Sequence, residues 1–210
     1  MAEREWVIAV TTKREIQVAA YDPEVDSWRL LPSIPGPPSD KNSLIWTGVD
    51  LLLVNSANGV YRLEPGADTW VHSGARSIGG NVIWTGSELL GVESDSLLRY
   101  DDVVDAWEGI PGPGLDGGRL VWTGTHVLVI SDQSPSSYLY NPRTEIWLEV
   151  AWPSRDDDQD QVSIWAEDRL VEWGGWQGAH GGPPSDAGWA LRPDLRRVDL
   201  FVEDPSSPDP

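Results

Sequence analysis

A short motif recurs along this 210-residue chain at nearly even spacing, and it limits the fold more than any other feature. The tripeptide Trp-Thr-Gly begins at Trp46, Trp84 and Trp122, 38 residues apart, and a degenerate copy, Trp165-Ala166-Glu167, follows. Each copy lies between two short apolar runs. A fixed period of about 40 residues indicates copies of one small structural unit that stack on each other.

A second motif alternates with the first and places a tryptophan seven residues after the start of a turn. The first residue of the turn is Tyr or Leu. The second is Asp, Glu, Asn or Arg, and the third is usually Pro. Its five copies begin at Tyr21, Leu63, Tyr100, Tyr140 and Leu191. The matching tryptophans are Trp28, Trp70, Trp107 and Trp147, and Val198 replaces the fifth.

Both motifs predict tight turns between short strands. Glycine supplies the positive φ that hairpin turns require, an Asx side chain bonds the turn backbone, and Pro fixes φ. We find no apolar period of 3.6 residues over 11 or more positions, so we expect almost no helix. Four short strands in about 40 residues are typical of a β-propeller blade. We therefore predict an all-β fold, a β-propeller of about five four-stranded antiparallel blades.

The first blade is expected to have three strands, because residues 6–10 align with the second strands of the other repeats. The last blade is expected to end with a strand over residues 198–202. The segment after it is rich in proline and cannot supply the missing strand. We predict a propeller over residues 1–203 that no C-terminal strand closes, and a disordered, Pro-rich acidic tail over residues 204–210.

The combined pattern, Trp-Thr-Gly before an apolar run and then Tyr-Asx-Pro-x-x-Asp-x-Trp, resembles the Kelch repeat in its bacterial variant. Kelch repeats usually end the second strand in two glycines, and here only Trp173-Gly174-Gly175 does so. The resemblance covers roughly residues 5–203 and implies a propeller. No strand ends in Trp-Asp, which disfavours the WD40 repeat.

The charge and the missing cysteines exclude several classes of function. Asp and Glu number 34 and Lys and Arg 15, which gives a formal net charge of −19. Proteins that bind nucleic acid or membrane surfaces electrostatically need a cationic face, so we expect neither partner. The absence of cysteine excludes disulfides and thiolate sites. No leader or long apolar run is recognisable, and we expect a cytoplasmic protein.

Tryptophans at fixed repeat positions are expected to be wedges between blades, each burying about 150–250 Å². Function is expected elsewhere, on the long and variable loops opposite the short turns. The largest loop, residues 174–186, contains Trp176, His180 and Asp186. An acidic loop with Asp156, Asp158 and Asp160 resembles the start of a calcium loop but lacks its glycine. The candidate ligand-binding residues are Trp176, His180, Asp186, Asp156, Asp158, Asp160 and Asp116.

These features favour a non-catalytic binding module. Its long-loop face would take a protein or small-molecule partner, above all a basic partner or a cation. No cofactor, metal site or catalytic group is predicted. The alternative is an enzyme, a hydrolase or lyase that acts on a small or sugar-like substrate in the central channel. An unclosed ring leaves strand edges, so we also expect self-association.

Overall fold

The computed structural model describes residues 6–11, 15–35, 42–79, 81–115, 117–131, 136–151, 162–175, 183–184 and 188–192. In these residues the regular secondary structure is β-strand, and neighbouring strands pair antiparallel. The prediction of an all-β, antiparallel fold is therefore confirmed. The described part of the chain contains no helix that could cross a membrane.

The chain divides into two compact units. Unit 1 comprises residues 1–93 and 97–110, and unit 2 comprises residues 94–96 and 111–210. The strands of unit 1 are β1 (Trp6–Thr11), β2 (Glu15–Asp22), β3 (Ser27–Leu30), β4 (Ile34–Pro35), β5 (Asn42–Trp46), β6 (Leu51–Asn55), β7 (Gly59–Leu63), β8 (Val71–His72), β9 (Val82–Trp84), β10 (Leu89–Glu93), β11 (Ser96–Asp101) and β12 (Ala106–Ile110). Those of unit 2 are β13 (Arg119–Trp122), β14 (Val127–Ile130), β15 (Ser136–Asn141), β16 (Ile146–Ala151), β17 (Val162–Ala166), β18 (Arg169–Trp173) and β19 (Gly188–Leu191).

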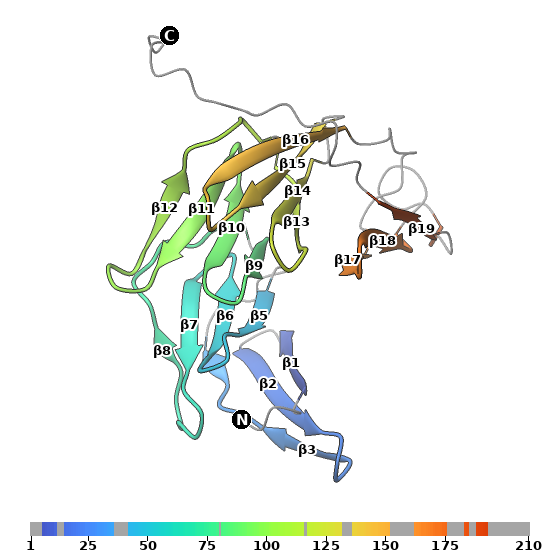
Figure 1. Cartoon of the computed structure of the whole chain (residues 1–210). Coiled ribbons are helices and arrows are strands. Elements are labelled where there is room, and N and C mark those ends of the chain that lie inside the picture. Colours follow the sequence, from blue (N-terminus) through green and yellow to red (C-terminus); the bar gives the residue numbers. More distant parts are fainter. Residues whose placement is uncertain are drawn as a thin grey trace. The chain divides into compact units, whose positions relative to one another are not determined.

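Consecutive strands pair into separate small sheets (Figure 1). Unit 1 holds the sheets β1–β4, β5–β8 and β9–β12, and unit 2 holds β13–β16 and β17–β19. Four sheets have four strand segments each, so the described residues form four blades rather than the five expected. The three-stranded sheet is the last one, whose expected fourth strand lies outside the described residues.

The first sheet is three strands wide, as the sequence predicts, although its outer strand is divided into two pieces. It has four strand segments, because β3 and β4 both pair with β2. The two strands lie end to end along one edge of β2, since β3 pairs with residues 19–22 and β4 with residues 15–16. The sequence predicted one outer strand here, and residues 31–33 interrupt it.

The Trp-Thr-Gly motif forms the hairpin turn that the sequence predicts. In the first copy Thr47 Oγ1 accepts a hydrogen bond from the Asp50 amide at 3.0 Å and donates to its carbonyl at 3.1 Å. Gly48 has a φ of 94°. The threonines of the next two copies, Thr85 and Thr123, make the same pair of bonds to Glu88 and His126.

Three contacts within the Tyr-Asx motif connect residues at its fixed positions. In the third copy Asp101 Oδ1 accepts from the Val103 amide at 2.8 Å, which is the expected Asx turn. Tyr100 then donates its hydroxyl to Asp105 Oδ1 at 2.6 Å, and its ring lies 5.2 Å from that of Trp107. The first copy repeats these contacts, from Tyr21 to Asp26 at 2.8 Å and to Trp28 at 4.8 Å.

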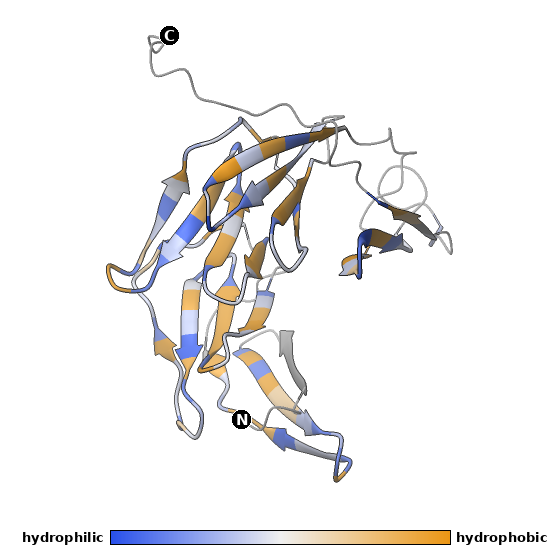
Figure 2. Cartoon of the chain, in the orientation of Figure 1, coloured by the Kyte–Doolittle hydropathy of each residue, from blue (hydrophilic) through white to orange (hydrophobic). Residues whose placement is uncertain are grey.

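The core lies between consecutive sheets. Side chains alternate across a strand, so β6 packs on two neighbours at once. Its Leu51 and Leu53 lie in one buried cluster with Val18 of the sheet before it, and Leu52 and Val54 lie in another with Leu89 of the sheet after it. All of β6 is buried, and Figure 2 shows its apolar colour. We call the two sides of a sheet its preceding face and its following face.

Whether a motif tryptophan is buried depends on the sheet next to it. Trp147 is 4% exposed, and its indole N–H donates to the Pro111 carbonyl at 2.8 Å. Trp70 donates likewise to the Pro32 carbonyl at 2.7 Å. The prediction of a buried wedge is wrong for Trp28, which is exposed on the preceding face of the first sheet, where no other sheet of unit 1 covers it. It is also wrong for Trp46, which is exposed at the end of β5.

Gly59 provides a test of the fit between β7 and the loop that follows β8. Its φ is 90°, and an added Cβ would lie 2.5 Å from the backbone oxygen of Ala75. Gly48 has nearly the same φ, but its Cβ would meet nothing within 4 Å. Backbone strain of this kind costs about 1–3 kcal/mol. We expect Gly59→Ala to lower the free energy of unfolding more than Gly48→Ala in urea titrations. Equal losses would contradict the close contact.

Candidate functional site

A cleft of about 380 Å³ lies in unit 1 at the turn end of the two sheets β5–β8 and β9–β12. We call it the turn cleft. The Trp-Thr-Gly turns of both sheets and the end of β11 form its walls. Its lining includes the aromatic residues Trp84 and Tyr100 and the charged residues Asp50, Arg62, Glu88, Arg99 and Asp102. Its volume lies in the range typical of small-ligand or side-chain pockets.

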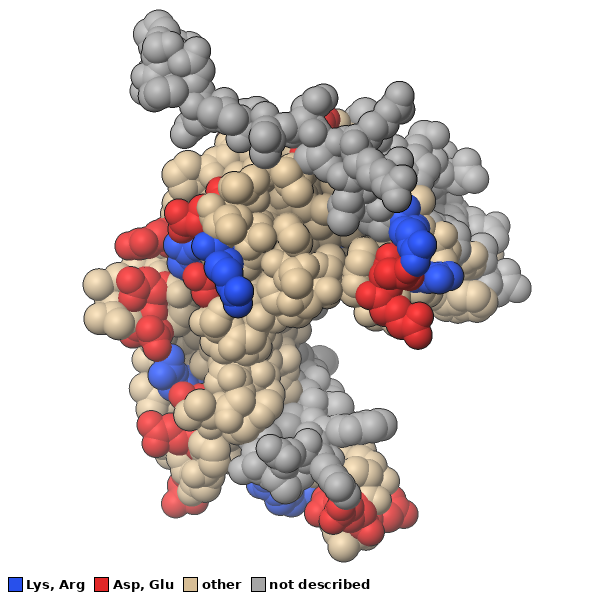
Figure 3. All heavy atoms as spheres, in the orientation of Figure 1, with Lys and Arg blue, Asp and Glu red and all other residues tan. Residues whose placement is uncertain are grey.

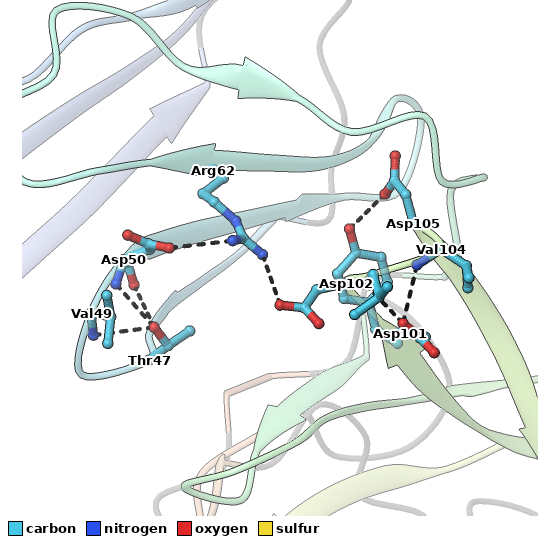
Figure 4. A network of polar contacts seen from close by, with 10 residues as sticks. Thr47, Val49, Asp50, Arg62, Asp101, Asp102, Val104 and Asp105 are labelled. Atoms are coloured by element: carbon cyan, nitrogen blue, oxygen red, sulfur yellow. Dashed lines mark hydrogen bonds and ion pairs between the residues drawn. The ribbon is translucent and has the colours of Figure 1, made fainter.

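Arg62 joins the two sheets across this cleft. Its guanidinium lies 3.4 Å from Asp50 of its own sheet and 3.7 Å from Asp102 of the next sheet (Figure 4). Asp102 is largely exposed at the tip of the β11–β12 turn. An ion pair exposed to this extent contributes little to stability. The pairing therefore orients Arg62 while leaving Asp102 accessible to a partner.

A second ion pair lies within the sheet β9–β12, where the Arg99 Nε is 3.4 Å from Glu88 Oε1. Asp50 and Glu88 occupy the same position of the Trp-Thr-Gly turn, four residues after the tryptophan. Arg62 and Arg99 occupy matching positions one residue before the Tyr-Asx turn. The charges of the turn cleft are thus one pattern repeated in two adjacent sheets.

Tyr100 and Asp105 form a polar pair beside the cleft. Burial, and then the hydrogen bond to Asp105, raise the pKa of Tyr100 to about 12. The same hydrogen bond is the main cause that lowers the pKa of Asp105. The Asp105 carboxylate also accepts a bond from the Gly74 amide, which follows β8. Asp105 therefore ties the third Tyr-Asx turn to the sheet before it.

We expect the Tyr100 phenol to stay protonated in the folded chain until about pH 12. An unfolded tyrosine ionises near pH 10, so the free energy of unfolding should fall as pH rises above 10. The difference in phenolate absorbance between the wild type and Tyr100→Phe measures this group among the five tyrosines. A difference curve with its midpoint near pH 10 would contradict the buried, hydrogen-bonded phenol.

Unit 2 places a different residue at the corresponding turn. His126 takes the position of Asp50 and Glu88, and its ring nitrogens lie 2.9 Å from Thr125 Oγ1 and 3.3 Å from Asn141 Nδ2. Burial lowers the pKa of His126. Burial therefore favours the neutral imidazole, and this turn lacks the carboxylate that its counterparts in unit 1 carry.

Unit 2 also contains a buried charged cluster between the sheets β13–β16 and β17–β19. The Glu172 side chain is fully buried, and its Oε1 lies 3.2 Å from Arg119 Nη2. Ser163 Oγ donates to the same oxygen at 2.7 Å and accepts from Arg119 Nη1 at 2.8 Å. The corresponding cross-strand pairs in the other sheets are apolar or glycine: Leu44–Leu53, Val82–Gly91 and Leu120–Val129.

The candidate residues predicted from sequence, Trp176, His180, Asp186, Asp156, Asp158, Asp160 and Asp116, all lie outside the described residues. The long-loop site therefore stays a prediction. The described residues contain no group of three His, Asp or Glu that could hold a metal ion. Sequence reasoning missed the turn cleft, although charges at matching repeat positions were the signal that could have found it.

Comparisons with solved structures identify the fold. The chain aligns with "Structure of YjhT" at 16% identity and a TM-score of 0.57, over 80% of this chain and 71% of that one. It aligns with the Cps50 (Swd1) β-propeller domain of Myceliophteria thermophila at 14% identity and a TM-score of 0.54, over 90% and 67%. A protein from Lactobacillus plantarum aligns at 13% identity and a TM-score of 0.55, over 92% and 68%.

These likenesses and the stacked antiparallel sheets show a β-propeller fold. No family model matches the chain, and no curated protein matches it.

Proposed function

We propose that this chain is a non-catalytic, Kelch-like propeller module that binds a basic protein segment. The observation that carries the proposal is the turn cleft with its acidic surroundings. Propellers present short loops on a rigid scaffold, which suits recognition of a partner. The described turn end, rather than the long-loop face, is the surface that we assign to the first contact.

The acidic surroundings extend over several turns of unit 1. Figure 3 shows acidic side chains over the β2–β3 turn at the bottom of the view and along the left border of unit 1. The carboxylates of these turns are Asp22, Glu24, Asp26, Asp50, Glu64, Asp68, Glu88, Asp101, Asp102 and Asp105. The arginines on or next to the same turns are Arg29, Arg62 and Arg99. The excess of negative charge steers a cationic partner to this end.

The turn cleft suits one Lys or Arg side chain of such a partner. Asp102 supplies an accessible carboxylate, and Trp84 and Tyr100 supply aromatic surface for the aliphatic stem or for a cation–π contact. A second hollow of about 410 Å³, between residues 29–32 and 63–68, includes Glu64 and Asp68 in its lining. Together these hollows give an extended basic segment two places to insert a side chain.

The test is binding of a labelled Lys- and Arg-rich peptide, followed by fluorescence anisotropy at low and high salt. We expect binding that weakens with salt, because exposed charges are screened. Asp102→Asn should weaken binding severalfold and leave thermal stability unchanged, since its ion pair is exposed. The matched control is Asp95→Asn, which removes an exposed carboxylate at the opposite end of the sheet β9–β12.

Failure of the peptide to bind would overturn the proposed function. Equal binding by the wild type and Asp102→Asn, together with weaker binding by Asp95→Asn, would overturn the assignment to the turn end and favour the long-loop face. The alternative function, a hydrolase or lyase with its site in the central channel, stays a prediction without support from the described residues.

A further inference from the structure

The first sheet carries a largely apolar face that no other sheet of unit 1 covers. On β2 and β3, Tyr21 pairs with Trp28 and Ala19 pairs with Leu30, so these four side chains share one side of the sheet. Trp28 is 57% exposed and Leu30 is 82% exposed. The other side of β2, with Ile16, Val18 and Ala20, is buried. The exposed side is the preceding face of the first sheet, and we call it the first end face.

The residues at matching positions in other sheets are buried or partly buried against a neighbouring sheet. Tyr140 and Trp147 correspond to Tyr21 and Trp28 in the Tyr-Asx motif, and they are 0% and 4% exposed. The indole of Trp70 donates to the carbonyl of Pro32, which lies between β3 and β4, and the indole of Trp147 donates to that of Pro111, which directly follows β12. The motif therefore forms half of a sheet-to-sheet interface, and the first end face is such a half.

The last sheet carries the complementary half. On β17 and β18, Val162 pairs with Trp173 and Ile164 pairs with Val171, so these residues share the following face of that sheet. Val162, Ile164 and Trp173 are exposed. The residue that corresponds to Ile164 in the sheet before it, Val121, is buried against the last sheet. We call this second surface the last end face.

We propose that the first end face of one chain binds the last end face of a second copy of the chain, head to tail. Each copy carries both halves of an interface that the repeats already use within units 1 and 2, so the contact continues the established stacking. Exposed apolar surfaces of this kind mark association sites.

This interface is heterologous and lies between sheet faces. It therefore differs from pairing of open strand edges, the route that the sequence suggested. A heterologous contact has a distinctive property: a copy with one blocked face still binds a copy with the opposite face blocked. The proposal is independent of the turn cleft, so loss of peptide binding and loss of self-association are separate results.

Three lysine variants test the proposal by sedimentation velocity on the full chain. The first-face variant is Trp28→Lys with Leu30→Lys, and the last-face variant is Val162→Lys with Ile164→Lys. The control is Val103→Lys with Val104→Lys, which adds the same charge at two exposed valines of the β11–β12 turn. We expect concentration-dependent association of the wild type and of the control. Each face variant alone should sediment as one chain.

The decisive sample is an equimolar mixture of the two face variants. We expect it to form a dimer, because one intact first end face meets one intact last end face. This result also shows that both variants are folded, which near-ultraviolet circular dichroism checks independently. The proposal is overturned if the wild type is a single chain at all concentrations. It is also overturned if the face variants associate like the control, or if the mixture remains monomeric.

Discussion

Replacing Glu172 by alanine should destabilise the chain strongly, by about 3–5 kcal/mol, because it leaves the Arg119 guanidinium without its buried counter-ion. Ser163, which donates to the same carboxylate, also loses its acceptor. Urea unfolding monitored by circular dichroism measures the loss. A change below about 1 kcal/mol, typical of exposed ion pairs, would contradict the burial of Glu172.

A triple variant tests whether apolar side chains can replace the buried charged cluster without loss of stability. Ser163→Leu with Glu172→Val restores the apolar pair that Leu120–Val129 and Leu44–Leu53 form in other sheets, and Arg119→Leu removes the cation that would otherwise lose its counter-ion. Replacing a buried ion pair by apolar residues is often neutral or stabilising by about 1–4 kcal/mol. We expect the triple variant to be at least as stable as the wild type. If it unfolds like Glu172→Ala, packing rather than charge pairing decides stability at this site.

The second large effect is expected for Trp147→Ala. The indole is buried against Gly112, where an added Cβ would lie 2.4 Å from Trp147 Nε1, and it donates to the Pro111 carbonyl. Removing a buried tryptophan costs about 3–5 kcal/mol through lost contacts and the cavity that remains. The midpoint of urea unfolding measures this loss.

Trp28→Ala is the matched control, because Trp28 occupies the same motif position in the first sheet. It is more than half exposed, so we expect a loss of about 0.5 kcal/mol or less at concentrations where the chain is monomeric. Similar losses for the two variants would mean that the first sheet is covered as fully as the others.

The comparison of Trp28 with Trp147 also shows how far the sequence can predict this fold. Local contacts were predictable, because Thr47 and Asp101 bond backbone groups two or three residues away. Burial was not, because identical motifs are covered or exposed according to the neighbouring sheet. The sequence therefore predicted strands, turns and their order, but not which wedge lacks a partner.

The same reason explains what was missed in the candidate site. Arg62 meets Asp102 only because two sheets lie side by side, and the two residues are 40 positions apart in the chain. Arg119, Ser163 and Glu172 likewise come together from two sheets. A search for local motifs favours loops with unusual composition, and it overlooks charges whose partners are supplied by a neighbouring repeat.

The stacked Tyr–Trp rings have a spectroscopic consequence. Tyr21–Trp28, Tyr100–Trp107 and Tyr140–Trp147 each bring two chromophores within 5.2 Å in three different sheets. Chains built from repeats that contact only their neighbours need not melt in one cooperative step. Each pair can act as a built-in optical probe of its own blade, so replacing one tyrosine at a time by phenylalanine would reveal the order in which the blades come apart.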